Sequence, residues 1–463
     1  MTTPVKLFSL VGLILAGTLC SGALAADTEE AISESPWTMF MGGPTHSGAI
    51  LGPLADIRTD LEWSTQVGYD HTSYSSQPVA AMGNVYVAIG GYVGVPGVGA
   101  EEYAVLALDA GTGEIQWVRT LPKGVTELAA STDRYSVFAG CRDGFLYALD
   151  MGTGTVDWKQ EIGPSIWSAP TIADDDLYIG SADGALYRIR VADGSTVWAT
   201  YLGRGSATSP VVVGDAVYVT TTNGEALRLT VWNGAIVWRT RLAGDCIASP
   251  SFSEGILFCG TAEGESSGRG RLTALCGATG GVLWEIDVAG EVLATPTVRD
   301  GIVYFSGNEP QAVSAADGST VWTSSMDTRG RPFVIADDGV VAVSPARGEV
   351  VVLDRDSGQL LYSFCPGEFA GDAPQVPLFL DFSVVITCAD GYVRCFDLTS
   401  TTITITNFSV TCVPLASVQT APSAASSDQA APGTLPRVVL QAILLLAHAL
   451  IFGVAMHWIG RLR

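Results

Sequence analysis

The chain has 463 residues, of which 47 are acidic and 24 are basic, giving a formal net charge of −23. A hydrophobic fraction of 48% is too high for a disordered chain. The negative charge argues against nucleic acid and anionic membrane surfaces as partners, since both need a basic surface. The only histidines are His46, His71, His448 and His457, which disfavours a histidine-based zinc site or a Ser–His–Asp triad.

The N-terminus, residues 1–25, has the pattern of a secretory signal peptide. Lys6 precedes an apolar run from Leu7 to Leu19, and the tripeptide Ala23-Leu24-Ala25 is a cleavage pattern of the A-x-A type. We therefore expect an exported protein that is cut after Ala25. Residues 26–60 would then form a lead-in to the fold.

The C-terminus carries a second apolar segment, Val438 to Ile459, which contains no charged residue. As a helix it would be about 33 Å long, enough to cross the hydrocarbon core of a bilayer. Its basic flanks place the C-terminus in the cytoplasm. We expect residues 437–463 to anchor the protein in the cytoplasmic or plasma membrane, with the folded domain outside. Processing to a lipid or sortase-type anchor is the alternative.

Residues 411–436 join the folded part to this anchor. They are rich in Ala, Ser and Pro and contain few large apolar side chains. Such a composition cannot bury a core and predicts a flexible stalk.

Residues 61–410 repeat one motif of about 40 residues. Aromatic residues recur at strand ends, and after the first interval the spacings are 41, 40, 40, 46, 38 and 40. A constant period with local insertions is typical of repeat proteins. The recurring aromatic residues are Trp63, Trp117, Trp158, Trp198, Trp238, Trp284, Trp322 and Tyr362.

The segment Leu177 to Trp198 shows the internal pattern of one unit. Short β-rich runs alternate apolar with polar residues and are separated by Asp-Gly turns, whose residues tolerate positive φ. With a short strand upstream, each unit has four strands, which predicts an all-β, eight-bladed β-propeller. The ring would close through Leu61 to Trp63 or, alternatively, through Thr402 to Phe408. The units start near Pro78, Leu128, Ser168, Thr208, Ala248, Ala294, Pro332 and Pro374.

A local motif within the repeat gives a family resemblance. Ala107 to Gly113 followed by Trp117 reads AxDxxTGxxxW, and the stretch from Ala148 to Trp158 repeats it. This resembles the tryptophan-docking repeat of pyrroloquinoline-quinone (PQQ) dehydrogenases and of the BamB family. The lead-in from Trp37 to Gly48 is also similar.

The physics of the motif assigns structural roles to its residues. Asp109 and Asp150 should accept hydrogen bonds from turn amides, while Gly113 and Gly154 allow the turn. The tryptophans should pack between blades and bury a large area. These docking residues are Trp117, Trp158, Trp198, Trp238, Trp284 and Trp322.

The resemblance offers two functions from different classes. PQQ enzymes resemble one another in a calcium held by Glu and Asn, an Asp base, a Trp floor and often adjacent cysteines. This chain has no Cys-Cys pair, and those ligands cannot be mapped onto it. We therefore assign no catalytic, cofactor-binding or metal residue, expect no cofactor and no enzyme, and keep a PQQ- or calcium-dependent oxidoreductase as the alternative. Calcium at Asp174 to Asp176 or Asp337-Asp338 is weighed against solvated loops, which we favour.

The favoured function is a non-catalytic protein-binding or scaffold module, as the BamB resemblance implies for envelope assembly. Partners would bind on the propeller faces or loops, with Gly90–Gly99 and Gly264–Arg271 as the longest insertions. The ectodomain is expected to be monomeric and to bind no nucleic acid. The chain departs from BamB-like proteins in having a C-terminal span and no clear lipoprotein signal.

Eight cysteines follow the signal peptide, which permits disulfides in an exported chain. Cys388 and Cys395 flank one turn on adjacent predicted strands and are the candidate disulfide pair. The alternative is that Cys395, like Cys259 and Cys276, is a free cysteine that packs as a small apolar side chain at an apolar strand position. Asn407 begins an N-glycosylation sequon, which matters only in a eukaryotic or archaeal host.

Overall fold

The chain divides into two compact units, Met1–Cys412 and Val413–Arg463, and every described residue belongs to the first. Within this described part no helix is long and apolar enough to cross a membrane. The computed structural model describes residues 41, 43, 45–46, 61–68, 73–74, 77–90, 103–263, 268–328, 332–337, 339–344, 349–366, 377–380, 383–388 and 390–397.

Several predicted segments lie outside the described residues. They are the signal peptide (1–25), most of the lead-in, the stalk (411–436), the membrane helix (437–463) and the sequon at Asn407.

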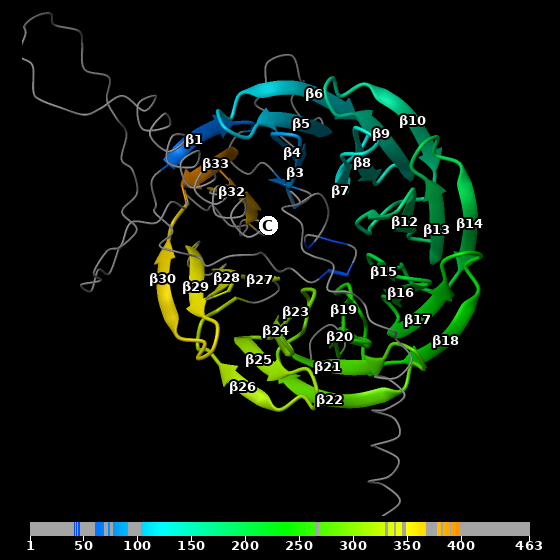
Figure 1. Cartoon of the computed structure of the whole chain (residues 1–463), viewed down its shortest axis with the longest axis vertical. Helices are drawn as coiled ribbons and strands as arrows, with labels where there is room; N and C mark the ends of the chain where they lie inside the picture. Colours follow the sequence, from blue (N-terminus) through cyan, green and yellow to red (C-terminus); the bar gives the residue numbers. More distant parts are fainter. Residues whose placement is uncertain are drawn as a thin grey trace, which may run out of the picture. The chain divides into compact units, whose positions relative to one another are not determined.

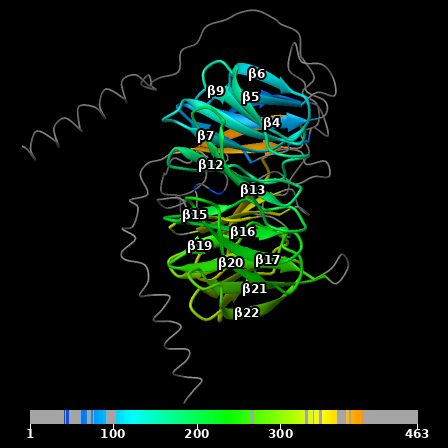
Figure 2. The ribbon, with the colours of Figure 1, turned by 90° about the vertical axis from the view of Figure 1, so that its right-hand side faces the viewer.

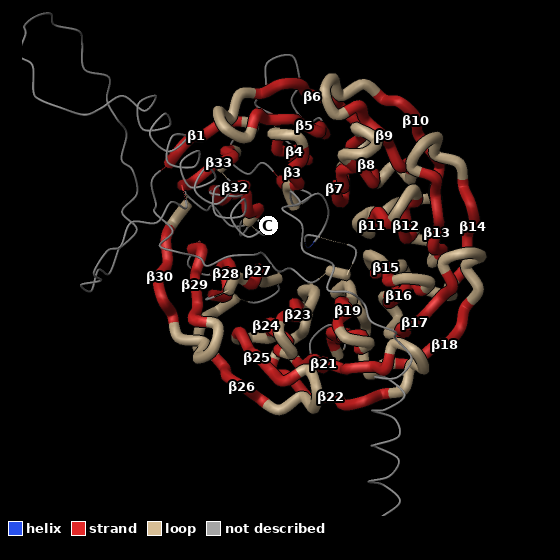
Figure 3. The backbone as a smooth tube through the Cα atoms, viewed as in Figure 1, coloured by secondary structure: helices blue, strands red, loops and turns tan. Residues whose placement is uncertain are grey.

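Eight antiparallel sheets form a ring around a central axis, as Figure 1 and Figure 3 show and as the 90° view in Figure 2 also indicates. Seven sheets have four strands, and the first has a fifth short strand, β2, paired with β4. The prediction of an eight-bladed, all-β propeller is therefore confirmed. We number the blades 1–8 in chain order and their strands first to fourth from the axis outward.

The first four blades follow one another without a break in the meander order. Blade 1 consists of β2 (Ser73–Tyr74), β3 (Val79–Ala81), β4 (Asn84–Gly90), β5 (Tyr103–Asp109) and β6 (Ile115–Leu121), and blade 2 of β7 (Val125–Ser131), β8 (Ser136–Cys141), β9 (Phe145–Asp150) and β10 (Val156–Glu161). Blade 3 consists of β11 (Thr171–Ala173), β12 (Asp176–Gly180), β13 (Ala185–Arg190) and β14 (Thr196–Tyr201), and blade 4 of β15 (Val211–Val213), β16 (Ala216–Thr221), β17 (Glu225–Thr230) and β18 (Ile236–Arg241).

The last four blades repeat the arrangement, except that the outermost strand of blade 8 comes from the start of the fold. Blade 5 consists of β19 (Ser251–Ser253), β20 (Ile256–Ala262), β21 (Arg269–Cys276) and β22 (Val282–Ala289), and blade 6 of β23 (Thr297–Arg299), β24 (Ile302–Ser306), β25 (Pro310–Ser314) and β26 (Thr320–Thr323). Blade 7 consists of β27 (Val334–Ile335), β28 (Gly339–Ser344), β29 (Glu349–Asp354) and β30 (Leu360–Phe364), and blade 8 of β31 (Leu378–Leu380), β32 (Ser383–Cys388), β33 (Tyr392–Asp397) and β1 (Leu61–Gln66).

Closure of the ring uses β1. This strand pairs antiparallel with β33, with Trp63 opposite Cys395. Of the two predicted closure schemes, the one through Leu61 to Trp63 is therefore the one that forms. Closure in this way leaves no inner or middle strand without a partner and joins the two ends of the repeat array.

The core lies between adjacent blades rather than at the axis. Tyr86 and Val105 of blade 1, for example, belong to one buried cluster with Leu128 and Leu149 of blade 2. Alternation of side chains along each strand sends successive residues to opposite faces of a blade, so both faces of each sheet are buried by neighbours.

The two faces of the ring differ in their connections. The interblade face carries the link from the fourth strand of one blade to the first strand of the next, together with the turns between second and third strands. The turn face carries the turns between first and second and between third and fourth strands. Trp167 lies in the β10–β11 connection on the interblade face, and Trp232 lies in the β17–β18 turn on the turn face.

Candidate functional site: blade seams, ring axis and interblade face

Each seam at which the outer strand of a blade carries a tryptophan has the same two contacts with the next blade, a hydrogen bond from the indole N–H and packing of the ring on a glycine, which together we call the seam lock. Trp117 on β6 donates its indole N–H to the carbonyl of Met151 in blade 2 at 2.9 Å, and Trp198 donates to Val231 at 2.8 Å. The ring lies against the glycine of the next blade's turn: a Cβ built on Gly154 would be 2.5 Å from a carbon of Trp117. The remaining locks join Trp63 to Ala110, Trp158 to Val191, Trp238 to Gly277, Trp284 to Ala315 and Trp322 to Arg355.

The turns that receive these rings are held by their aspartates. The Oδ1 of Asp109 accepts hydrogen bonds from the backbone N–H groups of Gly111 (3.0 Å) and Thr112 (2.8 Å) and from the Thr112 hydroxyl (3.0 Å). Asp150 is placed in the same way in the next blade. Gly113 has φ of 71°, in the left-handed region that favours glycine.

This geometry gives the ten docking residues predicted from sequence a structural role. Each indole donates its N–H to a backbone carbonyl, and one face of its ring packs on a glycine. Neither that N–H nor that face is therefore available to a ligand. Tyr362 holds the position of Trp322 in blade 7, since it lies opposite Val352 as Trp322 lies opposite Ala312.

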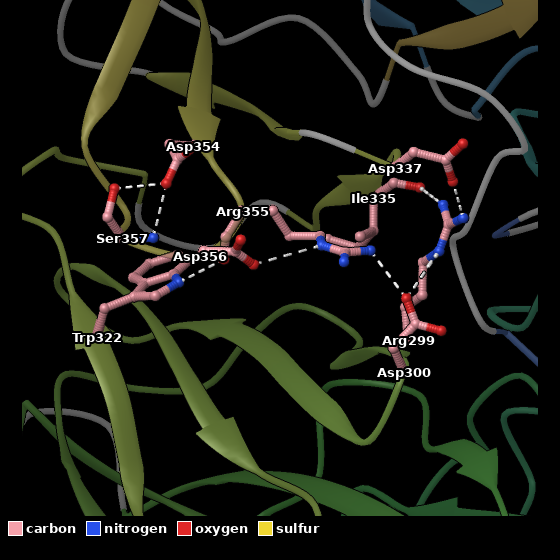
Figure 4. A network of polar contacts seen from close by, with 9 residues as sticks. All are labelled: Arg299, Asp300, Trp322, Ile335, Asp337, Asp354, Arg355, Asp356 and Ser357. Atoms are coloured by element: carbon pink, nitrogen blue, oxygen red, sulfur yellow. Dashed lines mark hydrogen bonds and ion pairs between the residues drawn. The ribbon is translucent and has the colours of Figure 1, made fainter.

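Arginine–carboxylate pairs reinforce the seams on the turn face. At the seam between blades 6 and 7, Arg299 pairs with Asp337, while Arg355 reaches back to Asp300 at 2.8 Å (Figure 4). The carbonyl of Arg355 also accepts the indole N–H of Trp322 at 2.8 Å. The ionic and aromatic contacts therefore meet at one residue of blade 7.

Arginine pairs also engage three aspartates of the runs that were weighed as calcium sites, Asp175, Asp176 and Asp337. Asp175 pairs with Arg134, and Asp176 pairs with Arg188 at 2.5 Å. These carboxylates are committed to arginines. In the described ranges no group of three or more His, Cys, Asp or Glu side chains is arranged to hold a metal ion.

The predicted Cys388–Cys395 disulfide is wrong in this structure, where both are free, buried cysteines. In the β32–β33 hairpin, Cys388 lies opposite Tyr392, whereas Cys395 lies opposite Val385. The two cysteines are thus three positions apart along the ladder, roughly 10 Å, and point to opposite faces. Cys276 and Cys365 are each disulfide-bonded.

Glu127 is a residue that sequence reasoning missed. It lies on the inner strand β7, where its Oε2 accepts the backbone N–H of Gln77 from blade 1 at 3.0 Å. Burial raises the pKa of this carboxyl to about 8, and the hydrogen bond from Gln77 offsets only part of that effect. The repeat itself carried a signal for this residue. Glu127 lies opposite Gly140 in blade 2, and the equivalent place in blade 3, beside Gly180, is held by Ser168, so a carboxyl group stands where the neighbouring blade has a small hydroxyl side chain.

A turn of the lead-in lies at the same axis. His46 is buried and its Nδ1 lies 3.0 Å from the carbonyl oxygen of Pro250 in blade 5. Burial lowers the pKa of His46 to about 4, because the charged imidazolium would be desolvated. The sequence pattern singled out this lead-in only as a family resemblance, without a position in the fold.

The interblade face exposes large apolar side chains. Trp167 is 52% exposed, and the Arg142 guanidinium lies 4.5 Å from the centre of its ring. Ile247 is exposed in the β18–β19 connection. The residue that precedes each of them, Ile166 before Trp167 and Cys246 before Ile247, is buried. The side chains of Trp167 and Ile247 therefore point outward from the connection.

Of the two long insertions predicted as contact loops, little is described. Residues 91–99 and 264–267 lie outside the described residues. The end of the second insertion, Arg269 to Arg271, forms the start of β21 and pairs with β20 and β22.

With this geometry in hand, comparison with known proteins identifies the family. The sequence profile of the family described as outer membrane protein assembly factor BamB matches residues 101–251, 202–267, 227–363 and 307–432, well over half of the chain. The chain belongs to this family of PQQ-like β-propellers. None of the curated proteins matches the sequence.

Solved structures share the fold at low identity. BamB from Moraxella catarrhalis is 19% identical with a TM-score of 0.55, over 72% of this chain and 100% of that one. The quinohemoprotein alcohol dehydrogenase of Comamonas testosteroni is 13% identical with a TM-score of 0.60, over 86% of each chain. The computationally designed Ika8 protein is 18% identical with a TM-score of 0.58, over 72% of this chain and 100% of that one. These likenesses show the fold alone.

Proposed function

We propose that this protein is a non-catalytic protein-binding module that holds its partner on the interblade face of the propeller. The family description, an outer membrane protein assembly factor, supports a scaffold role in the cell envelope. The observation that carries the proposal is Trp167, exposed beside Arg142 on that face.

Exposure of this pair is informative because most tryptophans of the ring are buried in seams. Tryptophan and arginine are the residues most often found at the energetic centre of protein interfaces. The net charge of −23 favours a partner with a basic surface, since such a field accelerates and selects its approach. Arg142 would then meet an acidic or carbonyl group inside an otherwise basic partner.

We further propose that the propeller is exported and stays tethered to the membrane. The support is the sequence pattern of residues 1–25 and 437–463, with the stalk between fold and anchor. A chain that ends after residue 436 should be released from the membrane fraction, while the full chain stays in it. Equal partition of the two chains would contradict the anchor.

The binding proposal is tested with the tagged full-length protein, crosslinked in membranes and purified in detergent. Trp167→Ala should reduce recovery of the crosslinked partner at least about tenfold, as truncation of an interface hot spot does. Trp232→Ala is the matched control, because this tryptophan is 72% exposed on the opposite, turn face. Equal recovery of the partner by both variants would overturn the assignment of the interblade face.

The competing function is quinone-dependent oxidation. It is separated by adding PQQ and calcium to the purified full chain and measuring dye-linked oxidation of alcohols and sugars. A stoichiometric complex with such activity would replace the binding-module proposal.

A further inference from the structure

The lead-in turn formed by Met41 and His46 lies inside the ring. Its trace, dark blue in Figure 1, lies within the circle of inner strands. Met41 is fully buried and His46 is 1% exposed. A segment outside the repeat array is therefore buried as deeply as the blade cores.

On one side this turn is bonded to blade 5. The carbonyl oxygen of Thr45 accepts the backbone N–H of Phe252 at 3.1 Å, next to the contact between His46 and Pro250. Phe252 lies on β19, the innermost strand, whose pairing with β20 uses only one edge. The lead-in turn thus satisfies an axial donor of that strand, which would otherwise be a free sheet edge.

On the other side the turn is bonded to blade 1. The backbone N–H of Met41 donates to Oε1 of Gln77 at 3.4 Å, and the backbone N–H of Gln77 donates to Glu127 of blade 2. Blades 1 and 5 are four places apart in a ring of eight and so face each other across the axis. One short turn therefore bridges opposite sides of the propeller.

The conformation of the turn shows that its surroundings hold it. Met41 and His46 have φ of 53° and 55°, in the left-handed region that is unfavourable for most non-glycine residues. A buried backbone with two such residues persists only where packing and hydrogen bonds fix it.

We infer that the described lead-in residues Met41, Gly43, Thr45 and His46 are a built-in occupant of the ring axis that ties blade 1 to blade 5, and that the axis filled in this way does not bind a calcium–quinone group. The inference stands on the lead-in contacts and does not depend on the proposed partner binding.

The residues at the axis do not fit a calcium–quinone group. Calcium binds through about six to eight oxygen ligands, chiefly carboxylates and carbonyl groups that have no other partner. Oε2 of Glu127 already accepts the backbone N–H of Gln77, and Oε1 of Gln77 already accepts the N–H of Met41. The carbonyl of Pro250 lies against His46.

Hydrogen exchange at single-amide resolution tests the bridge in the full-length protein. Phe252 should exchange about tenfold more slowly than Val212, as one added hydrogen bond predicts. Val212 is the matched control: it has the same place on β15 of blade 4, where the described residues provide no axial acceptor. Equal exchange at both amides in the unmodified protein would overturn the inference.

Two substitutions at His46 separate the bridge from general stability. His46→Asn keeps a side-chain donor and tolerates positive φ, so slow exchange at Phe252 should be retained. His46→Ala removes the donor and should bring Phe252 to the rate of Val212, with slow amides of the blade cores unchanged. Retained protection of Phe252 in His46→Ala would count against the bridge.

A binding measurement tests the second half of the inference. PQQ with calcium, titrated into the unmodified chain and followed by equilibrium dialysis, should show no stoichiometric complex. One tightly bound PQQ per chain would overturn the claim that the filled axis does not bind such a group, even if the exchange result stands.

Discussion

The indole nitrogen of Trp63 donates a 2.9 Å hydrogen bond to the carbonyl of Ala110 and so joins the last blade to the first. Trp63 lies on β1, which is the first described strand in the sequence but forms the outer strand of blade 8. Its ring covers Gly113 in the same way that the other tryptophans cover theirs. The ring is therefore closed twice at one place, by strand pairing within blade 8 and by the seam lock to blade 1.

Truncation of a seam tryptophan should destabilise the fold strongly. We expect Trp198→Ala to lower the free energy of unfolding by about 3–5 kcal/mol, because it removes a large buried ring and its hydrogen bond to Val231. Trp158→Ala should behave alike. Thermal unfolding followed by calorimetry measures the change.

The exposed Trp232 provides the control for that measurement. Trp232→Ala should change stability by less than about 0.5 kcal/mol, as surface substitutions do. If Trp198→Ala melts like Trp232→Ala, the seams do not hold the ring together.

Glycine is required at the seam for space as well as for conformation. Gly113→Ala should cost more than Gly83→Ala, although both glycines have φ near 70° (71° and 75°). The Cβ of alanine would lie 2.5 Å from the ring of Trp63 at position 113 and would meet nothing within 4 Å at position 83. Gly83→Ala should lose about 1–2 kcal/mol from backbone strain alone. Urea unfolding of the two variants gives the difference, and equal midpoints would contradict packing of Trp63 on Gly113.

The fold could be predicted from sequence because its rules act over short distances. Asp109, Gly113 and Trp117 lie within nine residues, and turn chemistry together with strand alternation fixes one blade. Repetition then supplies the ring. Strand register is less visible from sequence, and the Cys388–Cys395 pairing failed because the hairpin register offsets the two by three positions.

The axial and interblade residues escaped prediction because they depend on contacts across the ring. The environment of Glu127 is created by Gln77, fifty residues away, and that of His46 by Pro250. Trp167 is exposed because its side chain points outward from the β10–β11 connection, and the sequence of this connection is similar to the sequences of the other connections. Neither burial nor exposure at these positions follows from the local pattern of one repeat.

The arginine pairs of the turn face should differ in strength according to their burial. Arg299 is 14% exposed at its side chain, whereas Arg134 is 43% exposed. We expect Arg299→Ala to cost about 1–3 kcal/mol, because its largely buried guanidinium also donates a hydrogen bond to the carbonyl of Ile335 across the seam. Arg134→Ala should cost less than about 1 kcal/mol, as screened surface pairs do. Chemical denaturation at low and high salt checks both values, and equal losses would contradict the dependence on burial.

The protonated carboxyl of Glu127 should make stability depend on pH. Its pKa rises from 4.5 to about 8 on folding, so between these values the folded protein holds a proton that the unfolded chain has lost. Its contribution is therefore complete below pH 4.5 and is lost as the pH rises through about 8. His46 has the opposite shift, and its contribution is lost only as the pH falls from 6.5 through about 4. A scan from pH 6.5 to 8 therefore follows Glu127, because it stays above the titration of His46 and below the pH near 9 at which the thiols of the buried cysteines ionise in the unfolded chain.

Over that window the unmodified protein should lose about 1–2 kcal/mol that Glu127→Gln retains, because glutamine keeps the acceptor for the Gln77 N–H without a charge to desolvate. Glu114→Gln, at an exposed turn of blade 1, should leave the pH dependence of the unmodified protein in place. The measurement is the melting temperature at intervals of pH. Identical slopes for Glu127→Gln and Glu114→Gln would show that Glu127 is ionised in the folded ring at neutral pH, and the axial carboxylate would then be charged beside the lead-in turn.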